Sequence, residues 1–71
     1  MLRGKNYLGS HVRAKRLELG LEYREAGQRM GVTGSTIGSW ESGRHPPEFI
    51  HYRAIFAFLG YVPDFMIAED A

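Results

Sequence analysis

GVTGSTIGSWESG, residues Gly31 to Gly43, is the stretch that decides the fold. Thr33 is a typical residue to cap the start of a helix, and glycine at position 43 is typical of the left-handed residue that follows the end of one. Ile37 and Trp40 lie three residues apart, so one helix turns both side chains toward the same inner face. The stretch therefore predicts a turn followed by a short helix with its apolar side packed into a core.

Further glycines divide the chain on both sides of this stretch, and the apolar residues between them recur at helical spacing. The predicted helices cover residues 8–19, about 22–30, 33–42 and about 47–59, and the glycines that end them are Gly20, Gly31, Gly43 and Gly60. The prolines before the fourth helix predict a stiff extended connection, because proline fixes its own φ and disfavours helix in the preceding residue. The residues expected to share helical spacing in the fourth helix are Phe49, Tyr52, Ile55, Phe56 and Leu59.

The chain has 71 residues, 44% of them apolar. A chain of this length forms one small domain, which we expect to span residues 1–71 with its core over residues 8–59. The half-apolar tail, residues 60–71, is expected to form a short helical turn against the core or to contact a second subunit. Because so short a chain buries little apolar surface, a homodimer is a natural way to add stability.

The sequence also argues against several classes of functional site and against a membrane location. There is no cysteine, and His11, His45 and His51 are too scattered to form a metal site. No catalytic motif occurs, so we expect no metal, no cofactor and no enzymatic activity. No apolar run approaches the roughly 20 residues of a membrane span, and the start of the chain lacks the apolar stretch of a signal peptide. We therefore expect a cytoplasmic protein with no membrane partner.

The net charge of +1 conceals an uneven distribution of charge. Residues 1–20 contain five basic residues and one acidic residue, whereas residues 46–71 contain one basic and four acidic residues. A basic end suggests a polyanionic partner, although the overall pI of about 8.2 is lower than is usual for nucleic-acid-binding domains.

Two short helices joined by a three-residue turn containing glycine form the geometry of a helix-turn-helix. The second helix presents its N-terminal residues to base edges in the major groove, while the first crosses the phosphate backbone. Ala26 and Gly27 supply the small residues that let these helices approach closely. The sequence therefore predicts that double-stranded DNA is the partner.

The chain resembles the XRE family of helix-turn-helix proteins, which includes phage repressors and Cro proteins. Beside the stretch quoted above, the likeness lies in VRAKRLELGL (Val12 to Leu21), TIGSWESGRHPP (Thr36 to Pro47) and FLGYVP (Phe58 to Pro63). The resemblance covers residues 8–59 and implies an all-α, lambda-repressor-like bundle of four or five helices. It also implies a dimeric transcriptional regulator, usually a repressor, with the recognition helix over Thr33–Ser42.

The resemblance implies one structural ion pair, and the chain departs from the family at one DNA-contacting position. In repressors of this type an arginine late in the first helix pairs with a glutamate late in the recognition helix, and Arg16 and Glu41 match these positions. The second helix often begins with a glutamine that contacts DNA, where this chain has Tyr23. A tyrosine donates one hydrogen bond but has no amide to pair with a base or a phosphate.

The positions that the resemblance assigns to base reading carry short residues: Gly34, Ser35, Thr36, Gly38 and Ser39. Bidentate recognition of guanine needs arginine or lysine, and that of adenine needs asparagine or glutamine. We therefore expect direct specificity to be poor or to rest on serine and threonine hydroxyl groups and on thymine-methyl contacts. We expect phosphate contacts and DNA shape to carry more of the binding than usual. The candidate phosphate contacts are Tyr23, Arg24, Thr33, Ser35, Ser39, Arg44 and His45, with Arg13 and Lys15 on the first helix as further members.

A second interpretation is a protein-interaction module. The aromatic residues of the C-terminal half exceed what a small core easily hides. On this view the chain serves a protein partner, as do antitoxin-like members of the family, which bind both a second protein and DNA. Salt-dependent binding to random duplex DNA distinguishes the two interpretations.

Overall fold

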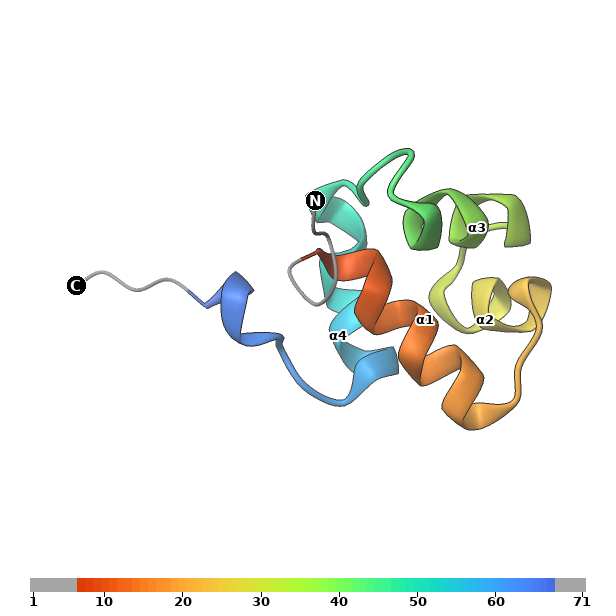
Figure 1. Ribbon diagram of the computed structural model, residues 1–71, viewed down its shortest axis with the longest axis horizontal. Coiled ribbons are helices and arrows are strands. Elements are labelled where there is room, and N and C mark those ends of the chain that lie inside the picture. The colour runs from red at the N-terminus through yellow and green to blue at the C-terminus, as the bar shows by residue number, and fades with distance from the viewer. Residues whose placement is uncertain (1–6, 68–71) are drawn as a thin grey trace.

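The computed structural model describes residues 7–67, and these form four α-helices and two short 3₁₀ turns without a β-strand (Figure 1). In chain order the elements are α1 (Leu8–Leu19), α2 (Tyr23–Met30), α3 (Gly34–Ser42), η2 (Phe49–His51), α4 (Tyr52–Leu59) and η3 (Asp64–Met66). The expected all-α fold with a helix-turn-helix is confirmed. Residues 1–6 and 68–71, which belong to the expected domain and tail, lie outside the described residues.

The ends of the helices follow the local sequence. The Oγ1 atom of Thr33 accepts a hydrogen bond of 3.1 Å from the backbone N–H of Thr36, so Thr33 caps α3 as predicted. At the start of α2, Glu22 is the capping residue and its N–H donates to Oε1 of Glu25 at 2.8 Å. All four predicted glycines follow their helices with φ between 70° and 87°. A β-carbon is costly in this left-handed region, which explains why glycine recurs there.

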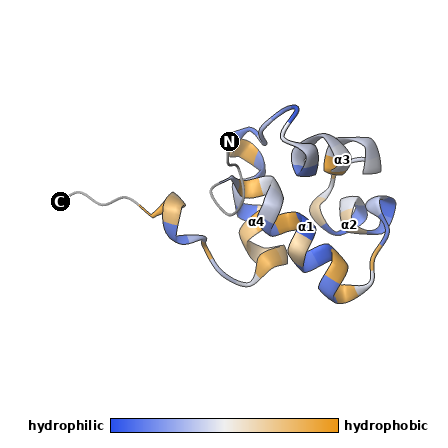
Figure 2. Ribbon diagram, in the orientation of Figure 1, coloured by the Kyte–Doolittle hydropathy of each residue, from blue (hydrophilic) through white to orange (hydrophobic). Residues whose placement is uncertain are grey.

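The core lies where the four helices meet, and α3 packs against both α1 and α2. Its buried apolar residues are Leu8, Val12, Ala26, Met30, Ile37, Trp40, Ile55 and Leu59. In Figure 1, α2 and α3 lie together at one end of the helical body, with α1 running past them to α4. Figure 2 shows that most of α3 is pale in hydropathy colour, since its surface consists of glycine, serine and threonine. The helix-turn-helix is therefore held from behind by apolar packing, and its outer side is polar.

The start of the fourth helix differs from the sequence prediction. Pro47 is buried, Glu48 is extended, and a 3₁₀ turn precedes the first residue of α4, which is Tyr52 rather than Pro47. The turn closes through a 2.9 Å hydrogen bond from the N–H of His51 to the carbonyl of Glu48. A 3₁₀ turn advances about 120° per residue instead of 100°, so the helical spacing of α4 does not extend back to Phe49. The expectation that Phe49 shares the helical spacing of the fourth helix is therefore wrong, and 69% of the residue is exposed.

The tail folds back on the helices as far as it is described. Met66 in η3 packs against the core, and the ring of Phe65 stacks on that of His11 in α1 at 5.8 Å between centroids. The hydroxyl of Tyr61 and Nδ1 of His11 are 2.8 Å apart and share a hydrogen bond. These contacts agree with the expected helical turn against the core. Within residues 7–67, no helix is long and apolar enough to cross a membrane.

Candidate nucleic-acid interface

The turn between α2 and α3 depends on glycine, which has no side chain, at position 27. The N–H of Val32 donates to the carbonyl of Gly27 at 2.9 Å, which brings the turn back onto α2. A β-carbon at Gly27 would collide with the carbonyl oxygen of Val32 and would lie 3.0 Å from the carbonyl carbon of Thr33. Both neighbours are backbone atoms, which cannot move aside as the end of a flexible side chain can. The small residue expected at this crossing therefore lets the backbone of the turn lie directly against α2.

Gly34 has a packing role that its sequence position conceals. A β-carbon there would lie 3.0 Å from the backbone nitrogen of Arg24 and 3.2 Å from the carbonyl carbon of Tyr23. This side of Gly34 faces the first turn of α2 and not the solvent. Glycine at this position lets α3 begin against the backbone of α2, and a reading side chain cannot point outward from it.

Most of the predicted contact residues line one polar groove between the start of α2 and the outer side of α3. The groove is lined by Tyr23, Gly34, Ser35, Gly38, Ser39, Ser42 and Arg44. Arg44 belongs to it because its N–H donates to the carbonyl of Ser39 at 3.1 Å, folding the chain back over the end of α3. Ser42 was not predicted, although it follows Ser39 by three residues on the same helical face.

The remaining predicted contacts lie beside this groove. Thr36 and His45 line a separate hollow with Trp40, Pro46, Glu48 and His51. The hydroxyl groups of Thr33 and Thr36 are 3.0 Å apart and hydrogen-bonded to each other at the start of α3. Arg24 is exposed in the first turn of α2. The structure thus divides the ten predicted contact residues between the groove, the second hollow and the exposed helix starts.

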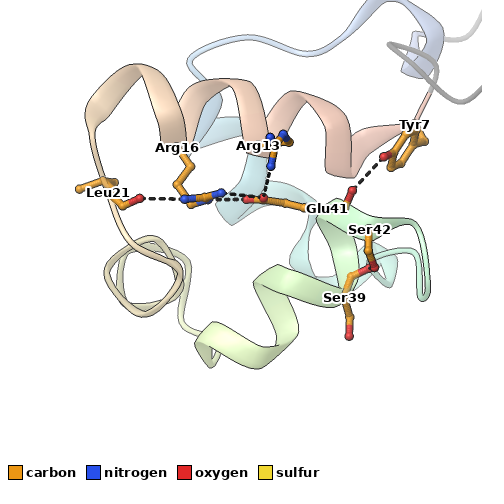
Figure 3. Close-up of polar contacts among 7 residues, drawn as sticks. All are labelled: Tyr7, Arg13, Arg16, Leu21, Ser39, Glu41 and Ser42. Carbon is orange, nitrogen blue, oxygen red and sulfur yellow. Dashed lines mark hydrogen bonds and ion pairs between the residues drawn. The ribbon is translucent and has the colours of Figure 1, made fainter.

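Arg16 and Glu41, the two residues of the expected ion pair, are brought together between α1 and α3 (Figure 3). Nε of Arg16 donates to Oε2 of Glu41 at 2.7 Å, and Nη2 donates to Oε1 at 3.0 Å. The third donor, Nη1, reaches the carbonyl of Leu21 at 3.0 Å. Both charged residues are buried. The hydrogen bonds with Glu41 raise the pKa of Arg16 above its ordinary value, so its charge persists at every pH relevant to binding.

Tyr23 connects this pair to the groove. Its ring lies over the guanidinium of Arg16, with 4.4 Å between Cζ of Arg16 and the ring centroid, a cation–π arrangement. On the groove side, Cε2 of Tyr23 is 3.8 Å from the position that a β-carbon of Gly38 would occupy. About half of Tyr23 remains exposed. The first residue of α2 is therefore held against both neighbouring helices and lines the groove.

Comparison with known proteins identifies the family. The helix-turn-helix domain family matches residues 7–64 of the chain. The chain belongs to this family. The helix-turn-helix domain described above is also similar to a protein of Methanothermobacter thermautotrophicus named as an uncharacterized HTH-type transcriptional regulator. The two are 38% identical over 61 residues, which cover 83% of this chain and 88% of that protein. No solved structure matches the chain significantly.

The charge around the groove of this helix-turn-helix domain is modest. Arg44 lines the groove, and the exposed Arg24 has its backbone next to Gly34, another groove residue. The two basic residues expected as further contacts on α1 have acidic neighbours: Nζ of Lys15 is 3.4 Å from Glu18, and Nη1 of Arg13 is 3.9 Å from Glu41. Because their charges are partly neutralised, α1 adds less positive potential than its sequence suggests.

Proposed function

We propose that this helix-turn-helix domain is a sequence-directed transcriptional regulator that binds double-stranded DNA with α3 in the major groove. The observation that carries the proposal is the open polar groove between α2 and α3, supported from behind by the buried Arg16–Glu41 pair. A helix held in this way presents its outer side to DNA without rearrangement. The name of the archaeal relative, an HTH-type transcriptional regulator, also supports this role.

The contacts follow from the residues around the groove. On this proposal the hydroxyl groups of Ser35 and Ser39, on the groove side of α3, enter the major groove, and Arg44 in the groove and the exposed Arg24 contact phosphates. Since α3 offers no arginine, lysine, asparagine or glutamine, bidentate base contacts are absent from it. DNA shape and phosphate contacts then carry much of the affinity.

We further propose that the protein is an XRE-type repressor that binds a palindromic operator as a homodimer. A two-fold dimer places its recognition helices about 34 Å apart, one turn of the double helix. Occupying such an operator blocks the access of other proteins to it. The exposed apolar side chains of Tyr61, Val62 and Phe65 in the tail provide surface for the second subunit. This role is one of binding, in the cytoplasm, without catalysis, metal or cofactor.

Titration of a fluorescent random-sequence duplex, followed by anisotropy, tests DNA binding. Binding that neutralises Z phosphates falls with salt on a log–log slope of about −0.9Z, so affinity should drop steeply between about 50 and 200 mM salt. Light scattering on the same sample measures the mass of the protein and reports the dimer. An absence of salt-dependent binding would contradict the proposed function.

A second candidate function is that of an interaction module resembling antitoxins, which bind a protein and DNA. The observation that favours it is the pair Phe49 and Ile50, which are 69% and 70% exposed and lie outside the polar groove. Adjacent exposed apolar residues are typical of a surface that a protein covers. If the protein is a monomer and its binding to DNA is weak and insensitive to salt, this second function is favoured.

A further inference from the structure

The middle of the recognition helix has no side chain with which to read a base. Gly38 lies on the groove side of α3, next to Ser39 and one helical turn after Ser35. Nothing but the ring of Tyr23 lies within 4 Å of a β-carbon built at Gly38, so packing does not demand glycine there as it does at Gly34. The space left by the missing side chain of Gly38 is therefore bordered by the ring of Tyr23.

Tyr23 occupies the space beside this gap. The ring atoms nearest to the β-carbon position of Gly38 are Cε2 at 3.8 Å and Cζ at 4.0 Å. Since Cζ carries the phenol oxygen, the hydroxyl group projects from a point beside the central turn of α3. A side chain larger than alanine at position 38 would compete with the ring for this space. Tyr23 on α2 thus supplies the polar group that α3 lacks at its centre.

One face of the ring is already packed in the protein without DNA. One face of it lies on the Arg16 guanidinium, which is itself held by both carboxylate oxygens of Glu41 and by the carbonyl of Leu21. A tyrosine has only two side-chain torsions, so restraining its ring leaves little freedom to lose on binding. The ion pair between α1 and α3 therefore also positions the phenol of α2.

We propose that Tyr23 is a specificity-determining residue of the DNA interface, with its phenol hydroxyl reading a base edge from beside Gly38. This inference rests on the proposed function, binding of duplex DNA through α3. A phenol donates to guanine O6 or N7, adenine N7 or thymine O4 in the major groove, and accepts from the amino group of cytosine or adenine. A phosphate contact by the same hydroxyl would carry no sequence information.

Selection from a random duplex library tests the assignment, with the parent protein compared with Tyr23→Phe. The change removes the hydroxyl but retains the ring over Arg16, so the fold is preserved. We expect preference at one or two positions of each half-site to relax by about 2- to 10-fold, the range for one hydrogen bond, while the rest of the consensus remains. Tyr52→Phe is the control, since it removes a phenol hydroxyl from α4, which does not line the groove, and it should leave the consensus unchanged.

A second variant tests whether the space beside Gly38 matters. Gly38→Gln places a long side chain where the ring lies and supplies an amide of its own. In this background, Tyr23→Phe should no longer alter the consensus. An equal effect in both backgrounds would show that the hydroxyl acts elsewhere than beside Gly38.

The outcomes separate this inference from the proposed function. If Tyr23→Phe weakens binding to every sequence alike and leaves the consensus intact, the hydroxyl contacts phosphate and the inference is overturned while DNA binding stands. If the parent binds random duplex in a salt-dependent way but selects no consensus, base reading by Tyr23 is overturned as well. If the parent binds no DNA, the proposed function fails together with the inference.

Discussion

Gly9 of α1 lies directly against the backbone of Trp40 in α3. A β-carbon at Gly9 would collide with the carbonyl oxygen of Trp40 and lie 2.5 Å from its carbonyl carbon. The two helices cross closely here, and the hydroxyl of Tyr7, just before α1, donates to the carbonyl of Glu41 at 2.8 Å (Figure 3). The C-terminal end of α3, the recognition helix, is therefore anchored to α1 at two points: this backbone crossing and the buried ion pair.

Gly9→Ala should destabilise the protein by about 2 to 3 kcal/mol or more, because the added carbon forces apart two backbones that cannot yield locally. The free energy of unfolding from urea titration, followed by circular dichroism, measures the loss. Alanine has the higher helix propensity, so a substitution that stabilised the protein would show that the helices separate at little cost.

Gly38→Ala should have the opposite effect. The new carbon meets only the ring of Tyr23, at ordinary contact distances of 3.8 and 4.0 Å, and position 38 is inside a helix. Replacing glycine by alanine there should stabilise the protein by up to about 1 kcal/mol. The same urea titration serves as the measurement. A lower midpoint would indicate that Gly38 is required by the fold, contrary to the space seen beside it.

Glu41→Gln should cost about 3 to 5 kcal/mol, because it leaves the charge of Arg16 buried without its partner. This is close to the whole stability of so small a domain, so the comparison is best made in the Gly38→Ala background. Glu18→Gln is the control: Glu18 pairs with Lys15 on the surface, and its loss should cost less than about 0.5 kcal/mol. Equal urea midpoints for the two variants would show that burial of the pair adds nothing.

Arg44→Ala should reduce the slope of log affinity against log salt by about 1 and weaken binding to all duplexes alike, as expected for one lost phosphate contact. Arg53→Ala removes an equal charge from an exposed position on α4 that does not line the groove. Anisotropy titrations at several salt concentrations provide both slopes. Parallel lines for parent and Arg44→Ala would remove Arg44 from the interface.

The local features of the fold were predictable from the sequence because each depends on nearby residues. The bounds of α1 and the cap at Thr33 follow from apolar spacing, capping chemistry and terminal glycines. The partnership of Arg16 with Glu41 required the family resemblance as well, since the two residues are 25 positions apart. No local rule connects side chains at such a separation.

The features that were missed depend on how elements meet in space. Gly9 is unfavourable in a helix by propensity alone, and only the crossing with Trp40 explains why glycine occurs there. Gly34 has a helical position that suggests exposure, but the backbone of α2 passes beside it. Phe49 follows a helical spacing that the 3₁₀ turn before α4 interrupts. In each case the deciding neighbour or backbone change leaves no trace in the local pattern of apolar residues.

The central claim, that the outer side of α3 is the DNA-binding surface, is tested most directly by an anisotropy titration of duplex DNA with Ser35→Glu. Ser35 is exposed in the first turn of α3 and lines the groove, and a glutamate there suits the helix dipole, so the fold should be kept. Facing phosphates, the added negative charge should weaken binding by at least about tenfold, while Ala57→Glu, on an exposed position of α4, changes it by less than about threefold. Equal affinities for Ser35→Glu and the parent would contradict the account.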